Sequence, residues 1–349
     1  MFRQLWTLAL VVLAALGSLA MPGCSNQVEP TKPSVATQAG ADSKPDRPPR
    51  ELTVDLGKGV KLKMVLIPAG EFMLGNGESA EATATFFNKT YGIDLNADYF
   101  KDEYPQHRVR ITRPFYLGIY PVTRGQFRQF VNGTGYKTDA EKGAKRGAYG
   151  LNPDTKKFDF NEKYSWRNAG FEQTDEHPVV SVSWNDSVAF CKWLSRKEGK
   201  TYRLPTEAEW EYTCRAGTTT RYCSGDDPET LAKVGNVADA TFKAKFPDWK
   251  YALKASDGYV FTAPVGSFKP NAFGLYDMHG NAWQWCEDRY GDYGKSRTDD
   301  PPGAGIGDFR VYRGGSWSNL PHQTRSASRS GAVPCVLFDI MGFRVARTQ

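Results

Sequence analysis

Three short motifs near the C-terminus combine glycines with aromatic and basic side chains. They read Gly280-Asn-Ala-Trp-Gln-Trp285, Arg313-Gly-Gly-Ser-Trp317 and Gly342-Phe-Arg-Val-Ala-Arg347. Glycine allows tight turns and a close approach of backbones, whereas Trp and Arg need partners when they are buried. The whole chain shares this character, with 34 Gly, 21 Pro and 13% aromatic residues. The combination predicts a loop-rich fold with aromatic anchors rather than long regular elements.

The N-terminus has the layout of a bacterial lipoprotein signal. Arg3 supplies a positive charge, the run Leu5–Met21 is apolar, and the small residue Gly23 stands directly before Cys24. We therefore expect residues 1–23 to be a signal peptide and Cys24 to be the lipidated first residue of the mature chain. An ordinary signal peptide or an N-terminal membrane helix is the alternative, although the apolar run is short for a span.

Residues 24–50 are rich in Pro, Ser, Thr and Ala and have almost no large apolar side chains. Such a segment cannot bury enough surface to offset its ordering entropy, so it is predicted to be a disordered tether. We interpret residues 51–349 as one domain, lipid-anchored in the bacterial cell envelope on the periplasmic side or at the outer membrane. The net charge of +6 is spread along the chain, which argues against a nucleic-acid partner.

Periodicity and capping residues predict a few regular elements in this domain. Alternating apolar residues predict strands at residues 60–75, 107–112, 310–313 and 343–346. Polar residues with capping-box spacing, each followed later by glycine, predict helices at residues 123–133, 183–199 and 206–217. Two other stretches, 76–106 and 137–176, are long and weakly periodic, which is typical of functional or disordered loops.

A series of motifs in a fixed order resembles the formylglycine-generating-enzyme family, also called sulfatase-modifying factors. Besides the three C-terminal motifs, the resemblance depends on Ile67–Met73, Pro114–Gly118, Pro121–Thr123, His177–Trp184, Arg203–Trp210 and Asn271–Tyr276. It extends from about residue 60 to residue 347. The resemblance implies an α+β fold, a loop-rich variant of the C-type-lectin-like fold with little regular secondary structure.

The copper chemistry of the family depends on a cysteine pair that follows the Arg-Gly-Gly-Ser sequence. In this chain the corresponding positions hold Asn319 and Thr324. Thiolates select Cu(I) because they are soft ligands, and an amide and a hydroxyl do not. We therefore expect no bound copper and no formylglycine-generating oxidase activity. A working oxidase remains an alternative if Cys286 or Cys335 approaches the site.

The other thiols and imidazoles give no strong motif. Outside the cytoplasm cysteines are expected to pair, but the odd number leaves the disulfide pairing open among Cys191, Cys214, Cys223, Cys286 and Cys335. There is no Gly-x-Ser-x-Gly sequence, and the four histidines do not have the spacing of a helical zinc site. His322, between the two replaced cysteine positions, is interpreted as a surface histidine.

The resemblance also implies calcium as cofactor, at one or two sites. The first would use the side chains of Asn236 and Asp257 and the carbonyls of Val237 and Tyr259. The second would use the side chains of Asp277 and Gln284, with backbone carbonyls from Met278, Gly280 and Ala282. Amide, carboxylate and carbonyl oxygens are the ligands that calcium prefers. The alternative is that Asp257 and Asp277 are turn residues.

A ligand groove is the remaining functional feature that the resemblance implies. Its expected lining is Trp283, Ser316, Trp317, Asn319, His322 and Thr324. A cleft with aromatic walls and hydrogen-bonding side chains can bind a peptide, a protein or a glycan. The alternative for the two tryptophans is a place in the core. We therefore expect a ligand-binding envelope lipoprotein, with a calcium-stabilised structural module and the oxidase as alternatives.

Overall fold

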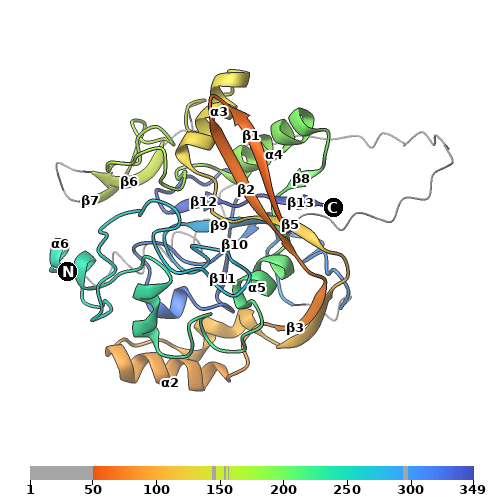
Figure 1. The fold of residues 1–349 in the computed structure, drawn as a ribbon. Helices are drawn as coiled ribbons and strands as arrows, with labels where there is room; N and C mark the ends of the chain where they lie inside the picture. Colours follow the sequence, from red (N-terminus) through yellow and green to blue (C-terminus); the bar gives the residue numbers. More distant parts are fainter. Residues whose placement is uncertain (1–49, 144–146, 153–154, 156, 294–297) are drawn as a thin grey trace. The chain divides into compact units, whose positions relative to one another are not determined.

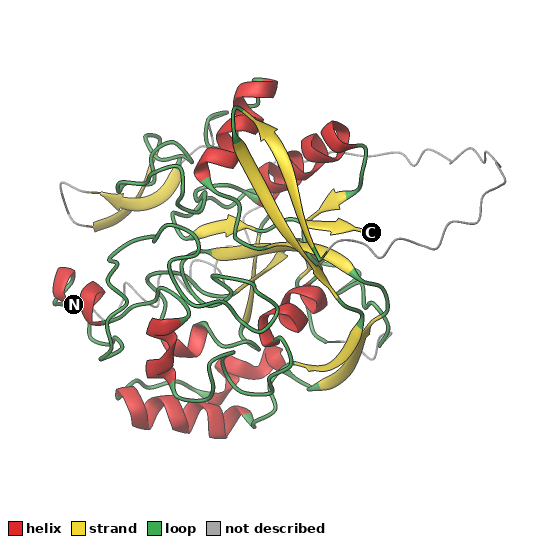
Figure 2. Cartoon of the chain, viewed as in Figure 1, coloured by secondary structure: helices red, strands yellow, loops and turns green. Residues whose placement is uncertain are grey.

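A computed structural model of the protein describes residues 50–143, 147–152, 155, 157–293 and 298–349 (Figure 1). The predicted signal peptide, Cys24 and all of the tether except Arg50 lie outside these residues. Within the described ranges, none of the helices combines the length and apolar character that crossing a membrane requires. The architecture is α+β with many long loops, as the sequence predicts (Figure 2).

One sheet joins the beginning of the domain to its end. Its five strands lie in the order β1-β2-β5-β13-β8. They span Glu51–Gly57, Val60–Ile67, Phe115–Gly118, Ala346–Thr348 and Tyr202–Arg203, respectively. Every pairing in this sheet is antiparallel. The strand β13 therefore lies inside the sheet, with β5 and β8 as its neighbours.

A second sheet carries strands from the first two C-terminal motifs and the start of the third. Its order is β11-β10-β9-β12, and β9 pairs in parallel with β12 and antiparallel with β10. The four strands span Arg329–Ala332, Arg310–Arg313, Trp283–Arg289 and Met341–Phe343. Two small two-stranded sheets contain the remaining strands, namely β3 (Gly70–Leu74) with β4 (His107–Ile111) and β6 (Ala148–Asn152) with β7 (Lys157–Asn161).

The three predicted helices are present and begin at the predicted caps. They are α3 (Arg124–Thr134), α4 (Trp184–Glu198) and α5 (Glu207–Arg215), and each begins with a reciprocal capping box. The shorter elements are η2 (Pro228–Lys233), α6 (Ala240–Lys245) and η3 (Pro321–Gln323). Helix α5 packs against β9 and β10 as well as β3 (Figure 1). It therefore links the second sheet to the β3-β4 sheet.

Some predicted elements differ from the observed ones. The strand predicted at 60–75 is divided into β2 and β3 at Pro68, whose nitrogen has no hydrogen to donate. The strand predicted at 343–346 is divided between β12 and β13, since the chain passes here from the second sheet to the first, and the buried Arg344 lies between them. Region 76–106, predicted to be a loop, contains the helix α2 (Ala80–Tyr91) and the 3-10 helix η1 (Ala97–Glu103).

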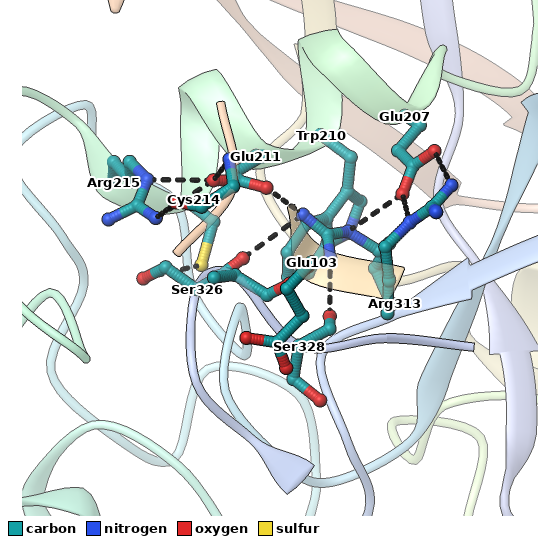
Figure 3. Close-up of polar contacts among 12 residues, drawn as sticks. Glu103, Glu207, Trp210, Glu211, Cys214, Arg215, Arg313, Ser326 and Ser328 are labelled. Carbon is teal, nitrogen blue, oxygen red and sulfur yellow. Dashed lines mark hydrogen bonds and ion pairs between the residues drawn. The ribbon is translucent and has the colours of Figure 1, made fainter. Parts of the chain in front are cut away.

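A buried ion pair joins the Arg-Gly-Gly-Ser-Trp motif to α5. Arg313, fully buried at the end of β10, donates to Glu211 of α5 and to the carbonyls of Ala327 and Ser328 (Figure 3). Burial opposes the charge of Arg313, but Glu211, Tyr293 and Glu207 together outweigh burial and raise the pKa of the guanidinium. The other carboxylate oxygen of Glu211 accepts hydrogen bonds from Gly75 N and Arg215 Nε, both at 2.9 Å. Glu211 therefore holds three separate segments together.

Two further buried ion pairs extend this network. Arg329 of β11 binds Glu207 of α5 with two hydrogen bonds of 2.7 Å. Burial opposes ionisation of Glu207, but Arg329, Arg313 and Tyr293 together outweigh burial and lower the pKa of the carboxyl. Arg325 binds Glu103 of η1 with hydrogen bonds of 2.8 and 2.5 Å. The network thus fastens the region after β3 to the C-terminal sheet.

We expect Glu211→Gln to destabilise the domain by about 3–5 kcal/mol, because it leaves the buried Arg313 with only the more distant Glu207, which Arg329 already binds. The free energy of unfolding from urea titrations measures the effect. The matched control is Glu71→Gln, which breaks the exposed pair with Arg108 and should change stability little. Equal effects of the two substitutions would contradict the central role of the buried pair.

Candidate functional site

The loop after β10 brings the two replaced cysteine positions against the glycine pair. A Cβ on Gly315, whose φ is +77°, would lie 2.3 Å from the Thr324 methyl, so only glycine fits this contact. Ser316 Oγ donates to Asn319 Oδ1 at 2.6 Å, and Asn319 Nδ2 donates to Gln323 Oε1 at 2.9 Å. Thr324 Oγ1 donates to the carbonyl of Pro321 at 3.1 Å. The side chains at 319 and 324 are therefore both engaged within the loop.

The six residues predicted to line a groove are all buried, with at most 7% of any of them exposed. The Trp317 ring packs among Phe158, Phe171, Phe242 and Phe261. Trp283 packs edge to face on Tyr312, with ring centroids 4.9 Å apart. In the described part of the chain, the two tryptophans are thus core residues. The structure does not place the predicted lining on an open surface.

The cover over this loop comes from α2 and η1. His322 lies edge to face with Phe87, Tyr99 and Phe100, at centroid distances of 5.8, 5.3 and 6.4 Å. Only 4% of His322 is exposed, so its interpretation as a surface histidine is wrong. Its Nδ1 has no hydrogen-bond partner in the described structure, and burial, helped by Arg325, lowers its pKa to about 3. The aromatic surroundings therefore keep the imidazole uncharged.

The thiol of Cys214 lies close to the same loop. Cys214 Sγ is 3.6 Å from His279 Nε2 and 3.7 Å from Ser326 Oγ. His279 Nδ1 is 2.7 Å from the carbonyl of Thr324, and Nε2 accepts from the backbone N of Cys223 at 3.0 Å. Burial raises the pKa of the Cys214 thiol to about 12. Cys214, which the sequence did not single out, thus reaches this loop region through His279 and Ser326.

The first predicted calcium set is brought together around Asp257. Its two carboxylate oxygens accept from the backbone N of Val237 and of Tyr259, both at 2.9 Å. Burial and the neighbouring Asp239 raise the pKa of Asp257. Asn236 is fully buried, and its Oδ1 has no hydrogen-bond partner in the described structure. The unbonded amide oxygen of Asn236 and the desolvated carboxylate of Asp257, which bonds to the adjacent residue Val237, are oxygen ligands of the kind that calcium prefers.

The second predicted calcium set does not fit the ion. Gln284 Oε1 already accepts from Trp210 Nε1 at 2.9 Å and from Arg344 Nε at 3.0 Å, and Gln284 Nε2 donates to the carbonyl of Asp277. The two carboxylate oxygens of Asp277 accept from Gly266 N and Asn281 Nδ2. The buried guanidinium of Arg344 therefore supplies a positive charge where calcium was expected.

The carbonyls that the second set also needs are partly engaged. Met278 O accepts a weak bond from Cys214 Sγ, and Gly280 O accepts from Ala282 N at 2.9 Å. A Cβ on Gly280 would lie 2.0 Å from the carbonyl of Asn236, so the two predicted sets are in direct contact at this glycine. Among the side-chain oxygens of the two sets, Asn236 Oδ1 of the first set is unbonded, whereas those of Asp277 and Gln284 in the second set are all bonded.

A cavity lies beside residues 167–177, most of which fall outside the family motifs. It has a volume of about 560 Å³, and its walls include Arg124, Arg167, Phe171, Gln173 and His177. Most of this lining belongs to the stretch 137–176, whose length predicted a functional or disordered loop. Arg124 is the first residue of α3, and no sequence motif indicates its place in a cavity, because the other lining residues are far from it along the chain. Phe171 separates the cavity from Trp317, at a centroid distance of 5.6 Å.

The chain is similar to known proteins over almost all of its described length. Residues 56–349 match the model of the sulfatase-modifying factor enzyme 1-like domain. The chain is 35% identical over 305 residues to formylglycine-generating enzyme of Streptomyces coelicolor, with 81% of this chain and 88% of that protein covered. It is 31% identical over 323 residues to inactive C-alpha-formylglycine-generating enzyme 2 of Bos taurus, with 84% and 90% covered. Relatives named as enzymes and as inactive are therefore both similar to it.

Solved structures give the same result for the fold. PvdO from Pseudomonas aeruginosa matches with a TM-score of 0.64 and 31% identity, over 87% of this chain and all of that chain (100%). Treponema denticola variable protein 1 matches with a TM-score of 0.60 over 86% of this chain and 100% of that chain, but at 21% identity this likeness shows the fold alone. The predicted variant of the C-type-lectin-like fold is confirmed.

We expect the buried His322 to make the domain sensitive to acid. Its folded pKa of about 3 lies below the unfolded value of about 6.5, so the unfolded chain binds more protons and stability falls as pH falls between these values. Going from pH 7 to pH 5 should cost on the order of 2 kcal/mol from this group. His322→Phe should reduce that loss, measured by urea unfolding at both pH values. An unchanged pH dependence would contradict the burial of a neutral imidazole.

Proposed function

Because this chain belongs to the sulfatase-modifying factor family, we propose that it is an envelope lipoprotein whose domain binds a peptide and does not oxidise cysteine through copper. The lipoprotein part of the proposal depends on Arg3, the apolar run Leu5–Met21 and Cys24. The loss of the oxidase depends on positions 319 and 324. The choice of a peptide as ligand depends on the cavity beside Phe171.

The single observation that supports the absence of copper chemistry most strongly is the closed hydrogen bonding of Asn319 and Thr324. Asn319 bonds to Ser316 and Gln323, and Thr324 bonds to the carbonyl of Pro321. Neither side chain supplies a soft ligand, and both are fixed in place by neighbours of their own loop. A linear or bent Cu(I) site needs two thiolates here, and this loop offers none.

A peptide ligand is favoured by the shape and walls of the large cavity. Its volume of about 560 Å³ is within the range of small-ligand sites. Its wall contains Phe171, which stacks on Phe261 with ring planes 2° apart. An aromatic wall next to amide and guanidinium groups suits amino-acid side chains and main-chain carbonyls. A glycan in the same place is the alternative ligand.

One observation favours the oxidase as a second candidate. Cys214 and the backbone of Cys223 both contact His279, whose other nitrogen is bonded to the carbonyl of Thr324. Two cysteines therefore lie close to the loop in which the family carries its copper pair. The high pKa of Cys214 opposes formation of a thiolate, and for this reason we place the oxidase second.

We expect the reduced, purified protein to convert no Cys-x-Pro-x-Arg peptide to formylglycine in the presence of Cu(I) and oxygen, as measured by mass spectrometry. Asn319→Cys combined with Thr324→Cys is the positive control, and it should gain binding of one Cu(I) because it restores two soft ligands. Formylglycine made by the unaltered protein would overturn the proposal. Loss of that product in Cys214→Ser would then identify the thiol responsible.

Peptide binding is tested by selecting phage-displayed random 12-residue peptides on the immobilised protein, beside a glycan array. Enrichment of peptides supports the proposal. Binding of glycans alone would replace the peptide by a glycan ligand. Binding of neither would favour a calcium-stabilised structural module.

We also propose that the domain binds a single calcium ion, at the first predicted set. Asn236 and Asp257 would hold the ion with the carbonyls of Val237 and Tyr259, and it would compensate the charge of a buried carboxylate. The unpartnered Asn236 Oδ1 supports this set, whereas the bonded Gln284 Oε1 argues against the second. The ion would then be a structural clamp for irregular loops.

We expect metal analysis to give one calcium ion per chain, and chelator to lower the melting temperature. Asn236→Ala should abolish most of this chelator effect, since it removes the free amide oxygen. Asn88→Ala, whose amide bonds only within the 88–95 segment, is the matched control and should keep it. Two calcium ions per chain, or a melting curve that does not respond to chelator, would contradict the proposal.

A further inference from the structure

The guanidinium of Arg124 lines the large cavity without a carboxylate partner. Its Nη1 and Nη2 donate to the carbonyls of Gln173 and Arg167, each at 2.8 Å. Its Nε has no acceptor in the described structure, and no ion pair joins Arg124 to a described acidic residue. Carbonyl oxygens hold the group in position but do not neutralise it, so Arg124 keeps a local positive charge at the cavity wall.

The other cations near this cavity are already compensated. Arg128 pairs with Asp175, and the Nε of Arg167 lies 2.7 Å from Glu141 Oε1. Arg167 also lies over the Trp166 ring, 4.3 Å from its centroid. Arg124 is therefore the uncompensated cation of this group, and its two neighbouring arginines, together with burial, lower its pKa.

The remaining titratable groups of the cavity limit the charge of a ligand. His177 Nδ1 accepts from Thr174 N at 2.9 Å, and burial lowers the pKa of His177, so the ring adds no charge at neutral pH. Glu172 also lines the cavity and adds a negative charge. A single anionic charge would balance Arg124, whereas a dianion such as a phosphate monoester would be repelled by Glu172. The chemistry of the wall therefore selects a carboxylate.

We propose that the Arg124 cavity binds a carboxylate of the peptide ligand, from an acidic side chain or from a free C-terminus, beside an apolar side chain that packs on Phe171. This inference rests on the proposed peptide-binding function and names the ligand group that the cavity recognises. A planar guanidinium pairs with a carboxylate through two parallel hydrogen bonds, and the carbonyls of Arg167 and Gln173 orient it for that contact.

The test uses N-acetylphenylalanine as the carboxylate probe and N-acetylphenylalaninamide as its uncharged control, in ligand-observed NMR with the full protein. We expect the acid to bind and the amide not to bind. Arg124→Gln should weaken binding of the acid at least tenfold, because it removes the charge-assisted hydrogen bonds. Arg113→Gln, an exposed arginine outside the cavity, is the matched control and should bind as the unaltered protein does.

Arg124→Lys tests whether a positive charge alone is enough for binding, because lysine keeps the charge and lacks the planar guanidinium. It should bind the acid more weakly than Arg124 and more tightly than Arg124→Gln, and thermal unfolding checks that each variant folds. Equal binding of acid and amide, or equal binding of the acid by Arg124→Gln and the unaltered protein, would overturn the inference.

Selected peptides distinguish failure of this inference from failure of the proposed function. Peptides that bind and lose at least tenfold in affinity when Glu is replaced by Gln, or when the C-terminus is amidated, support it and identify the source of the carboxylate. Peptides that bind equally well to Arg124→Gln overturn the inference and leave peptide binding intact. The absence of any bound peptide would overturn the proposed function, and with it the role of the cavity.

Discussion

The buried pair between Arg313 and Glu211 is the interaction on which the other parts of this domain depend. Burying two charges is costly, and the cost is offset only when the remaining donors and acceptors are bonded as well. Here the guanidinium also bonds to the carbonyls of the 326–328 segment, and the carboxylate also bonds to Gly75 and Arg215. A loop-rich chain with little regular structure thus gains a fixed centre from which β10, α5 and the end of β3 are positioned.

The same network determines what the family loop can do. Arg325 and Glu103 fasten η1 over the segment that follows Ser316, and Phe87 of α2 packs on His322. The side chains at 319 and 324 are thereby enclosed and bonded within their own loop. The cavity lies elsewhere, and it is lined by Arg124 and by Phe171 and other residues of the 167–177 segment. The aromatic group around Trp317 separates the two regions.

Local signals in the sequence predicted the helices that begin with capping boxes, since Thr123, Ser183 and Thr206 each bond within four residues of themselves. Helix α2 was missed although Ser79 caps its start and Gly92 ends it in a left-handed conformation. Its apolar face is short, and its partner His322 lies far along the chain. The family resemblance implied the first calcium set, which stays a prediction; the structure shows Asp257 bonded to the backbone of Val237 and Tyr259. The motifs could not predict that Arg344 would reach Gln284, nor that Arg124 would face a cavity, because both depend on tertiary packing between distant segments.

The position of β13 has a consequence for when this domain can form. Residues 346–348 lie between β5 and β8, and they pair with both. The sheet that begins with β1 and β2 therefore closes only when residues 346–348 have paired with residues 115–117. Segments so far apart along the chain lose much loop-closure entropy before their hydrogen bonds can form, and such non-local pairings fold slowly. The last strand to join this sheet thus lies between strands that come much earlier in the sequence.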